Sequence, residues 1–180
     1  MSKKEHVSAT PATMWLKQHK VPFEDGIYEY VEHGGTAQAA ACFGVDEHNV
    51  VKTLIMQDEH EKPLVILMHG DREVSTKNLA RQTNRKHIEP CKPAIAEKNS
   101  GYQVGGTSPF GTKKNMPVYV EKTILDMPFI YINGGRRGYN VKIDPRVLKD
   151  QLGAIEVECA IEKYNRKTVR LFVLQIFNFS

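Results

Sequence analysis

Short apolar runs separated by polar turns dominate the chain from residue 50 onward. Residues 50–56 (VVKTLIM) and 64–68 (LVILM) are nearly continuous apolar segments, joined by the charged residues DEHEK. Residues 139–143 alternate Tyr, Val and Ile with Asn and Lys, which is typical of a strand with one buried face. The predicted strands are 50–56, 64–68, 118–120, 129–132, 139–143 and a last one through Ile155, Val157 and Cys159.

Helix ends are marked by caps and stop residues. Thr10 is expected to cap a helix with Pro11 at its first position, where the missing N–H is not needed, and Pro22 ends any continuation. Its buried side is expected from Met14, Trp15 and Leu16. The further predicted helices are 36–43 with Thr36 as cap and Gly44 as stop, Ser75 to Asn84, Lys92 to Lys98, and Asp144 to Gly153.

Strands follow one another without a regular alternation with helices. This order favours an α+β fold, a single domain with a curved mixed β-sheet of about six to seven strands flanked by helices. No linker divides the chain, so we expect a domain over residues 1–162. Residues 163–180 run from a basic patch into an apolar segment and are expected to form a tail, either an added strand or a packing arm at an oligomer contact.

Composition sets the broad class. With 41% hydrophobic residues among 180, the chain has enough apolar side chains for one core without disulfides. The three cysteines are an odd number, with no CxxC pair and no matching histidine cluster. We therefore expect no metal site and no cofactor, and a reducing, cytoplasmic compartment.

Charge and targeting signals narrow the partners. The first fifteen residues lack the apolar stretch of a signal peptide, and no window approaches 18 apolar residues, so no membrane partner is expected. A net charge of +4 is compatible with a polyanion such as RNA, although many proteins without such a partner are equally basic.

Two glycine-rich segments could carry a binding site. Gly101 to Gly111 (GYQVGGTSPFG) has paired glycines that expose backbone N–H groups, with hydroxyls at Thr107 and Ser108. It lacks the ending of a Walker loop and the pattern of a dinucleotide fingerprint. The second segment, GGRRG at 134–138, adds two arginines suited to an anionic backbone. Each segment is equally compatible with a structural turn, the second with solvated charges.

Lys52 is a lysine inside an apolar strand. By alternation it either faces solvent or lies at the mouth of an apolar pocket. In a pocket, desolvation lowers its pKa and its ammonium can stabilise a negatively charged group. The histidines show no HExxH spacing, and Ser108 lacks a GxSxG elbow, so a serine nucleophile is not indicated.

VVKTLIM, GYQVGGTSPFGTKK and IYINGGRRG, in this order, resemble the YbaK/EbsC family over residues 10 to 160. The family comprises free-standing relatives of the editing domain of bacterial prolyl-tRNA synthetases. The resemblance implies a YbaK-like fold and hydrolysis of mischarged aminoacyl-tRNA. It also implies the acceptor end of aminoacyl-tRNA as partner, with prolyl-tRNA synthetase as a candidate and the oligomeric state, a dimer included, left open.

The resemblance also implies roles for single residues. Lys52 matches the family's essential lysine, here the expected catalytic residue, and Gly105 matches the glycine whose backbone lies against the substrate ester. Asn133 stands where the cysteine-specific branch often has serine, and Asn140 where an acidic residue is usual. The expected substrate-binding residues are Tyr28, Thr53, Gly105, Gly106, Thr107, Ser108, Asn133, Gly134, Gly135, Arg136 and Asn140.

The resemblance and the residues together predict a mechanism. Lys52 and the N–H groups near Gly105 and Gly106 are expected to hold the aminoacyl ester, while water, a ribose hydroxyl or the substrate's own thiol attacks. Cysteine on tRNA(Pro) is the expected target, with alanine as a second. The rival interpretations are a non-catalytic RNA-binding module that uses the same basic turns, and a regulatory domain that assembles through residues 163–180.

Overall fold

The structure, a computed structural model, describes residues 8–163; residues 1–7 and 164–180, and with them nearly all of the predicted tail, lie outside this part. The helices are α1 (Pro11–Gln18), α2 (Gly35–Phe43), α3 (Thr76–Gln82), α4 (Pro93–Ser100) and α5 (Arg146–Asp150), with short 3-10 turns η1 (Glu47–Asn49) and η2 (Lys122–Asp126). The strands are β1 (Glu24–Ile27), β2 (Val50–Asp58), β3 (Pro63–His69), β4 (Arg72–Val74), β5 (Ile88–Pro90), β6 (Val118–Glu121), β7 (Ile130–Arg136), β8 (Tyr139–Ile143), β9 (Ile155–Val157) and β10 (Ala160–Glu162).

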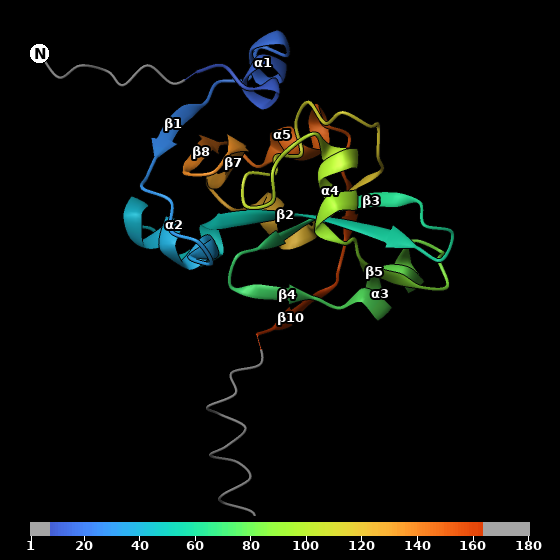
Figure 1. The fold of residues 1–180 in the computed structure, drawn as a ribbon. Coiled ribbons are helices and arrows are strands. Elements are labelled where there is room, and N and C mark those ends of the chain that lie inside the picture. Colours follow the sequence, from blue (N-terminus) through green and yellow to red (C-terminus); the bar gives the residue numbers. More distant parts are fainter. Residues whose placement is uncertain (1–7, 164–180) are drawn as a thin grey trace, which may run out of the picture.

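One mixed sheet organises the domain. Its strand order is β1-β8-β7-β2-β3-β6-β9, and β5 pairs with β2 beside this path, which makes eight strands (Figure 1). The small pair β4 and β10 lies apart from it. The predicted α+β class, single domain and mixed sheet are confirmed. The predicted strand number of six to seven is too low, because β1 (EDGI) and β5 (IEP) are too short to show an apolar alternation.

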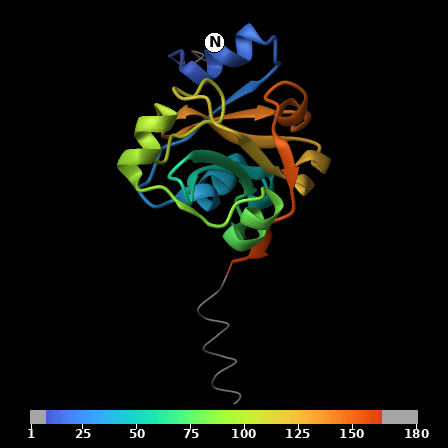
Figure 2. The ribbon, with the colours of Figure 1, turned by 90° about the vertical axis from the view of Figure 1, so that its right-hand side faces the viewer.

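The long strand β2 has a buried cluster on each face. Val51 and Ile55 belong to the main core, which α1, α4 and α5 cover. On the opposite face, Val50 packs with α2 and Met56 packs with α3. Figures 1 and 2 both show α1 and α3 at opposite ends of the molecule, with the sheet between them. The sheet therefore separates two layers, and the second layer consists of two smaller clusters.

Several predicted element ends are confirmed. Thr10 caps α1 through a capping box, Ser75 caps α3, and Gly44 ends α2 in the left-handed conformation at φ 64°. Thr36 is not the cap of α2: the helix begins at Gly35, and the Thr36 hydroxyl instead donates to Glu47 Oε1 at 2.7 Å.

Three predicted core positions are wrong or displaced. Met14 is 61% exposed, and α1 buries Leu16 together with Ala12 and Thr13. Ile155 is 57% exposed because β9 is an edge strand, and Cys159 is buried but follows the strand. Across residues 8–163, no helix combines the length and apolarity needed to cross a bilayer.

Candidate active site

One edge of β2 changes its partner in the middle of the strand. β7 pairs in parallel with Val50 and Val51, whereas β5 pairs in antiparallel register from Met56 onward. Within the described residues, 52–54 have no strand partner on this edge, although β3 pairs with them on the other. Unpaired strand edges present backbone groups and side chains to a ligand. The middle of β2, which includes Lys52, is therefore accessible from the side of β7.

Lys52 lies between the two clusters of the second layer. It shares a face with Val50 and with Leu54, because side chains two residues apart on a strand point the same way. Its side chain is half-buried, and its Nζ donates a hydrogen bond to the carbonyl oxygen of Gly70 over 3.5 Å. Lys52 is therefore not a freely solvated side chain, and its position at the mouth of a pocket stays a prediction.

The surroundings of Lys52 act on its pKa in both directions. Burial lowers the pKa of the ammonium below its ordinary value, and the nearby Lys163 lowers it further. Glu73, Glu47 and Asp71 raise it without cancelling the lowering. The result is an ammonium group that is only partly solvated and that gains from a nearby negative charge.

Gly70 is packed too closely to carry a side chain. A Cβ at this position would lie 2.6 Å from the Cβ of Thr36 and 2.8 Å from the backbone oxygen of Val50. Its N–H also donates to that oxygen over 2.7 Å. The carbonyl that holds Lys52 is therefore fixed between α2 and β2. The sequence pattern offered no signal for Gly70, and it marked Thr36 only as a helix cap.

The segment 101–111 is a loop with free N–H groups. Gly105 has φ +88°, a conformation that favours glycine. The Gly106 N–H donates to Gln103 O over 2.8 Å, so it is used inside the loop. The N–H groups of Gly105, Thr107 and Ser108 have no hydrogen-bond partner among residues 8–163. Such donors are suited to an oxyanion or to an ester oxygen.

The far half of the same loop is anchored in the core. Ser108 is fully buried, and its Oγ accepts from the N–H of Phe110 over 3.3 Å. The Tyr102 hydroxyl donates to the carbonyl oxygen of Phe110, which is also fully buried. Ser108 is therefore a structural residue of the loop, and its contact with substrate stays a prediction. The part of the loop with free N–H groups fits the binding interpretation, and the buried part fits the structural-turn interpretation.

The second glycine-rich segment closes against the first. Asn133 Nδ2 donates to Gly105 O over 3.3 Å and to Arg136 O over 3.1 Å, and Asn133 Oδ1 accepts from the Gly135 N–H over 2.7 Å. Gly106 lies against the backbone of Arg136: a Cβ added at residue 106 would lie only 2.8 Å from the carbonyl carbon of Arg136. Gly134 O accepts from the Thr10 hydroxyl. The two motifs predicted from the sequence thus form one surface.

The register of β2, β7 and β8 places further predicted residues near Lys52. Lys52 and Asn133 directly follow the last paired residues of β2 and β7, so strand alternation puts their side chains on one face where the two strands part. Asn140 pairs with Asn133 on β8 and is buried. Tyr28 belongs to the α2 cluster of this face, and burial raises the pKa of its hydroxyl.

Thr53 differs from the other predicted residues. By strand alternation it faces the main core, between Val51 and Ile55, and not the side of Lys52. Its Oγ1 is buried and is the one side-chain oxygen or nitrogen in the described part that is buried without a hydrogen-bond partner. Its contact with substrate stays a prediction.

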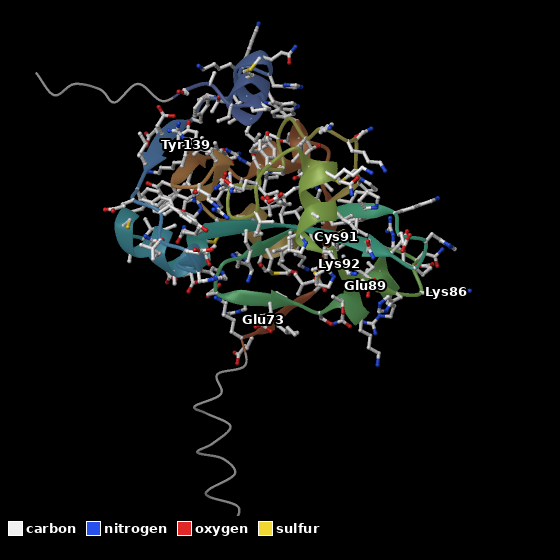
Figure 3. The ribbon with its side chains drawn as sticks, in the orientation of Figure 1. Glu73, Lys86, Glu89, Cys91, Lys92 and Tyr139 are labelled. Carbon is white, nitrogen blue, oxygen red and sulfur yellow. The ribbon has the colours of Figure 1, made fainter. Side chains whose placement is uncertain are left out.

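Two residues beside Gly105, Arg137 and Tyr30, are not among the expected substrate-binding residues. Arg137 Nε donates to Val104 O over 2.9 Å, and its guanidinium lies 5.0 Å from the ring centre of Tyr30. A Cβ on Gly105 would lie 2.9 Å from the Tyr30 hydroxyl. The GGRRG pattern pointed to this arginine, whereas no signal in the sequence marks Tyr30. Tyr139, the first residue of β8, lies beside β1 in Figure 3, and the guanidinium of Arg136 lies 5.2 Å from the centre of its ring.

One group of side chains has the chemistry of metal ligands. Ligand atoms of His48, His69 and Asp71 lie within 4.8 Å of one another. His69, however, already uses Nδ1 with His48 O and Nε2 with the Thr123 hydroxyl, both at 2.8 Å. His48 Nδ1 contacts Asp71 Oδ1 at 2.8 Å. The arrangement favours a hydrogen-bonded brace between η1 and β3 over a metal centre.

A groove of about 540 Å³ lies away from these residues, between β1, β8 and α5. Its lining includes Glu24, Lys142 and Asp150 and none of the predicted site residues. The candidate site is thus an open surface at the split edge of β2 and is distinct from this groove.

Comparisons with known proteins concern the family and the fold of the chain. A family model described as "Aminoacyl-tRNA editing domain" matches residues 32–150, which contain Lys52, both glycine-rich segments and Asn140. A protein of Enterococcus faecalis described as "Putative Cys-tRNA(Pro)/Cys-tRNA(Cys) deacylase EbsC" is 29% identical over 151 residues, which cover 82% of this chain and 91% of the relative.

Two further likenesses concern prolyl-tRNA synthetase. A proline–tRNA ligase of Ligilactobacillus salivarius is 29% identical over 110 residues, 59% of this chain but only 19% of the ligase. A solved structure described as "Crystal structure of a putative trans-editing enzyme for prolyl tRNA synthetase" has a TM-score of 0.74 at 17% identity, covering 86% of this chain and 99% of the other. At that identity it supports the fold alone.

Proposed function

Because the chain belongs to the aminoacyl-tRNA editing domain family, we propose that it is an aminoacyl-tRNA deacylase, a hydrolase that removes a wrongly attached amino acid in trans. The observation that carries this proposal is that Asn133 follows the β2–β7 pairing on the face of Lys52 and is bonded to the loop of free N–H groups at Gly105.

The proposed chemistry follows from these groups. An ester carbonyl placed against the N–H groups of Gly105 and Thr107 develops a negative oxygen when it is attacked. Each donor aimed at that oxygen is worth about 2.7–4 kcal/mol in the transition state. The Lys52 ammonium, poorly solvated in the folded protein, adds a charge that offsets the oxyanion or orients the terminal ribose. The attacking group is water, a ribose hydroxyl or the thiol of a cysteinyl substrate.

Cysteine on tRNA(Pro) is the proposed substrate, with alanine as a second. The similarity to the Enterococcus protein supports cysteine. Asn133 stands where the cysteine-specific branch often has serine, and its amide is occupied by Gly105 O and Arg136 O. A small apolar pocket discriminates by only about 1–3 kcal/mol per methylene, so overlap between small side chains is expected. The acceptor end of the tRNA and a prolyl-tRNA synthetase are the proposed partners, in the cytoplasm.

A deacylation panel tests the proposal. Cys-, Ala-, Ser- and Pro-tRNA are incubated with the full chain, with and without prolyl-tRNA synthetase. The proposal predicts release of cysteine or alanine from tRNA(Pro) and intact Pro-tRNA. Salt-sensitive binding of tRNA with no release of any amino acid would instead favour a non-catalytic RNA-binding module.

A further inference from the structure

Arg137 and Tyr30 form a charged platform directly beside Gly105. The guanidinium of Arg137 lies 5.0 Å from the centre of the Tyr30 ring, and its Nε donates to Val104 O over 2.9 Å. A Cβ on Gly105 would lie 3.3 Å from that Nε and 2.9 Å from the Tyr30 hydroxyl. The platform and the loop of free N–H groups are thus in van der Waals contact.

Most of the hydrogen-bonding capacity of Arg137 is unused. Arginine has five N–H donors, and among residues 8–163 only the Nε–H of Arg137 has a partner. Neither Arg137 nor the neighbouring Arg136 forms an ion pair with a carboxylate in this part of the chain. A guanidinium held in place at one nitrogen, with a free fork of donors, matches the geometry of a phosphate.

The position of the Arg137–Tyr30 platform indicates which phosphate of the tRNA it would bind. In the proposed function the ester lies at Gly105 and Lys52, and in an aminoacyl-tRNA this ester is on the ribose of the last nucleotide. One ribose separates the ester from the 5′-phosphate of the same nucleotide. Asn133 shares the face of Lys52 and bonds to Gly105, and Arg137 lies against Gly105, so a nucleotide laid along this contact can reach both.

We infer that Arg137, held by Tyr30 and Val104 O, binds the 5′-phosphate of the nucleotide that carries the ester. This inference rests on the proposed function, because it assigns a substrate group to the same site. It makes Arg137 a phosphate-binding residue and the Tyr30 ring its support.

Binding of small nucleotides tests the inference without any turnover. CpA, whose adenosine carries a 5′-phosphate in diester linkage, is compared with adenosine by titration into the full chain, with inorganic phosphate as a third probe. The expected result is that CpA binds at least about tenfold more tightly than adenosine and than inorganic phosphate, as for a hydrogen-bonded charged group. In Arg137→Gln the preference for CpA over adenosine falls to about twofold or less.

Two variants separate phosphate binding from a structural role. Arg137→Lys keeps the charge but loses the fork, so it is expected to retain part of the preference for CpA. Arg81→Gln removes an equal charge from the exposed helix α3 and should leave the preference unchanged. Equal loss of adenosine and CpA binding in both Arg137 variants would show a purely structural arginine and overturn the inference. Equal binding of CpA and adenosine to the unaltered chain, or binding of inorganic phosphate as tight as that of CpA, would overturn it as well.

The deacylation assay, run beside the nucleotide titrations, distinguishes failure of this inference from failure of the proposed function. If the chain releases no amino acid from any tRNA but prefers CpA through Arg137, the phosphate site stands and the enzymatic proposal fails. If it deacylates tRNA yet shows no preference that depends on Arg137, the enzyme stands and the phosphate site fails.

Discussion

Asn133 donates a hydrogen bond from its Nδ2 to the carbonyl oxygen of Gly105 over 3.3 Å. This contact joins the middle of β7 to a loop 28 residues earlier in the chain. Asn133 also follows the last residue of β7 that pairs with β2, which places it on the face of Lys52. One amide side chain therefore connects the proposed catalytic lysine with the loop that offers free N–H donors.

Removing this amide should loosen the loop. Asn133→Ala loses the contacts to Gly105 O and Arg136 O and the acceptor of the Gly135 N–H. Because such bonds contribute about 0.5–1.5 kcal/mol each, losing the three should lower the free energy of unfolding by about 1.5–4.5 kcal/mol. Chemical denaturation measures this loss, and a decrease in kcat/KM for aminoacyl-tRNA should accompany it. Unchanged stability and turnover would show that Asn133 neither stabilises the fold nor positions the loop.

Gly70→Ala should disturb Lys52 from a distance. The new Cβ would meet the Thr36 side chain and the Val50 oxygen, so the carbonyl that accepts from Lys52 must shift. We expect a loss of activity of about tenfold or more, because misplacement near reacting groups by an ångström can cost about a hundredfold. Gly44→Ala is the matched control. Its glycine has φ +64° with open space around it, so that variant should lose stability but keep kcat. Equal kcat losses in both variants would contradict the role of Gly70.

Helix ends with strong local signals could be predicted from the sequence. Short strands that depend on pairing with another strand could not. The caps at Thr10 and Ser75 and the stop at Gly44 were found because each is a local backbone requirement. β5 was missed because three residues carry no period, and its existence depends on pairing with β2.

The candidate site was predicted in the same uneven way. Lys52 and the glycine-rich segments were recognised as motifs, and the structure brings Gly105, Asn133 and Arg136 together. Tyr30 and Gly70 were missed because their roles arise from packing between distant segments. No local pattern in the sequence shows that residue 70 must be glycine because Thr36 packs against it.

The buried hydroxyl of Thr53 predicts a stabilising substitution. Thr53→Val should raise the free energy of unfolding by about 1–3 kcal/mol, because it removes a buried oxygen that has no partner. Thermal or chemical denaturation measures the change. Deacylation measured in parallel tests the predicted substrate contact: a loss of kcat/KM beside the gain in stability would support it. A less stable variant would contradict the assignment of an unpaired hydroxyl.

The lowered pKa of Lys52 predicts opposite effects on stability and on activity. Burial penalises the charged lysine of the folded state at every pH below its folded pKa, and the penalty fades as pH rises from there toward the ordinary value. Lys52→Met should therefore be at least as stable as the unaltered chain at pH 7.

The pH dependence of activity should show the same group. If the ammonium form acts, enzymatic deacylation falls as pH rises through the lowered pKa of Lys52, after subtraction of spontaneous ester hydrolysis. The midpoint is expected below the ordinary lysine value. A profile that stays flat up to that value would show that the charge of Lys52 is not required.

The central claim is that Lys52 acts on an aminoacyl ester at the split edge of β2. The most direct measurement is single-turnover deacylation of Cys-tRNA(Pro) by the unaltered chain, by Lys52→Ala and by Lys86→Ala, a lysine on the exposed surface. We predict loss of at least about a hundredfold in rate for Lys52→Ala, an unchanged melting curve, and a normal rate for Lys86→Ala. Turnover by Lys52→Ala at the rate of the unaltered chain would contradict the account.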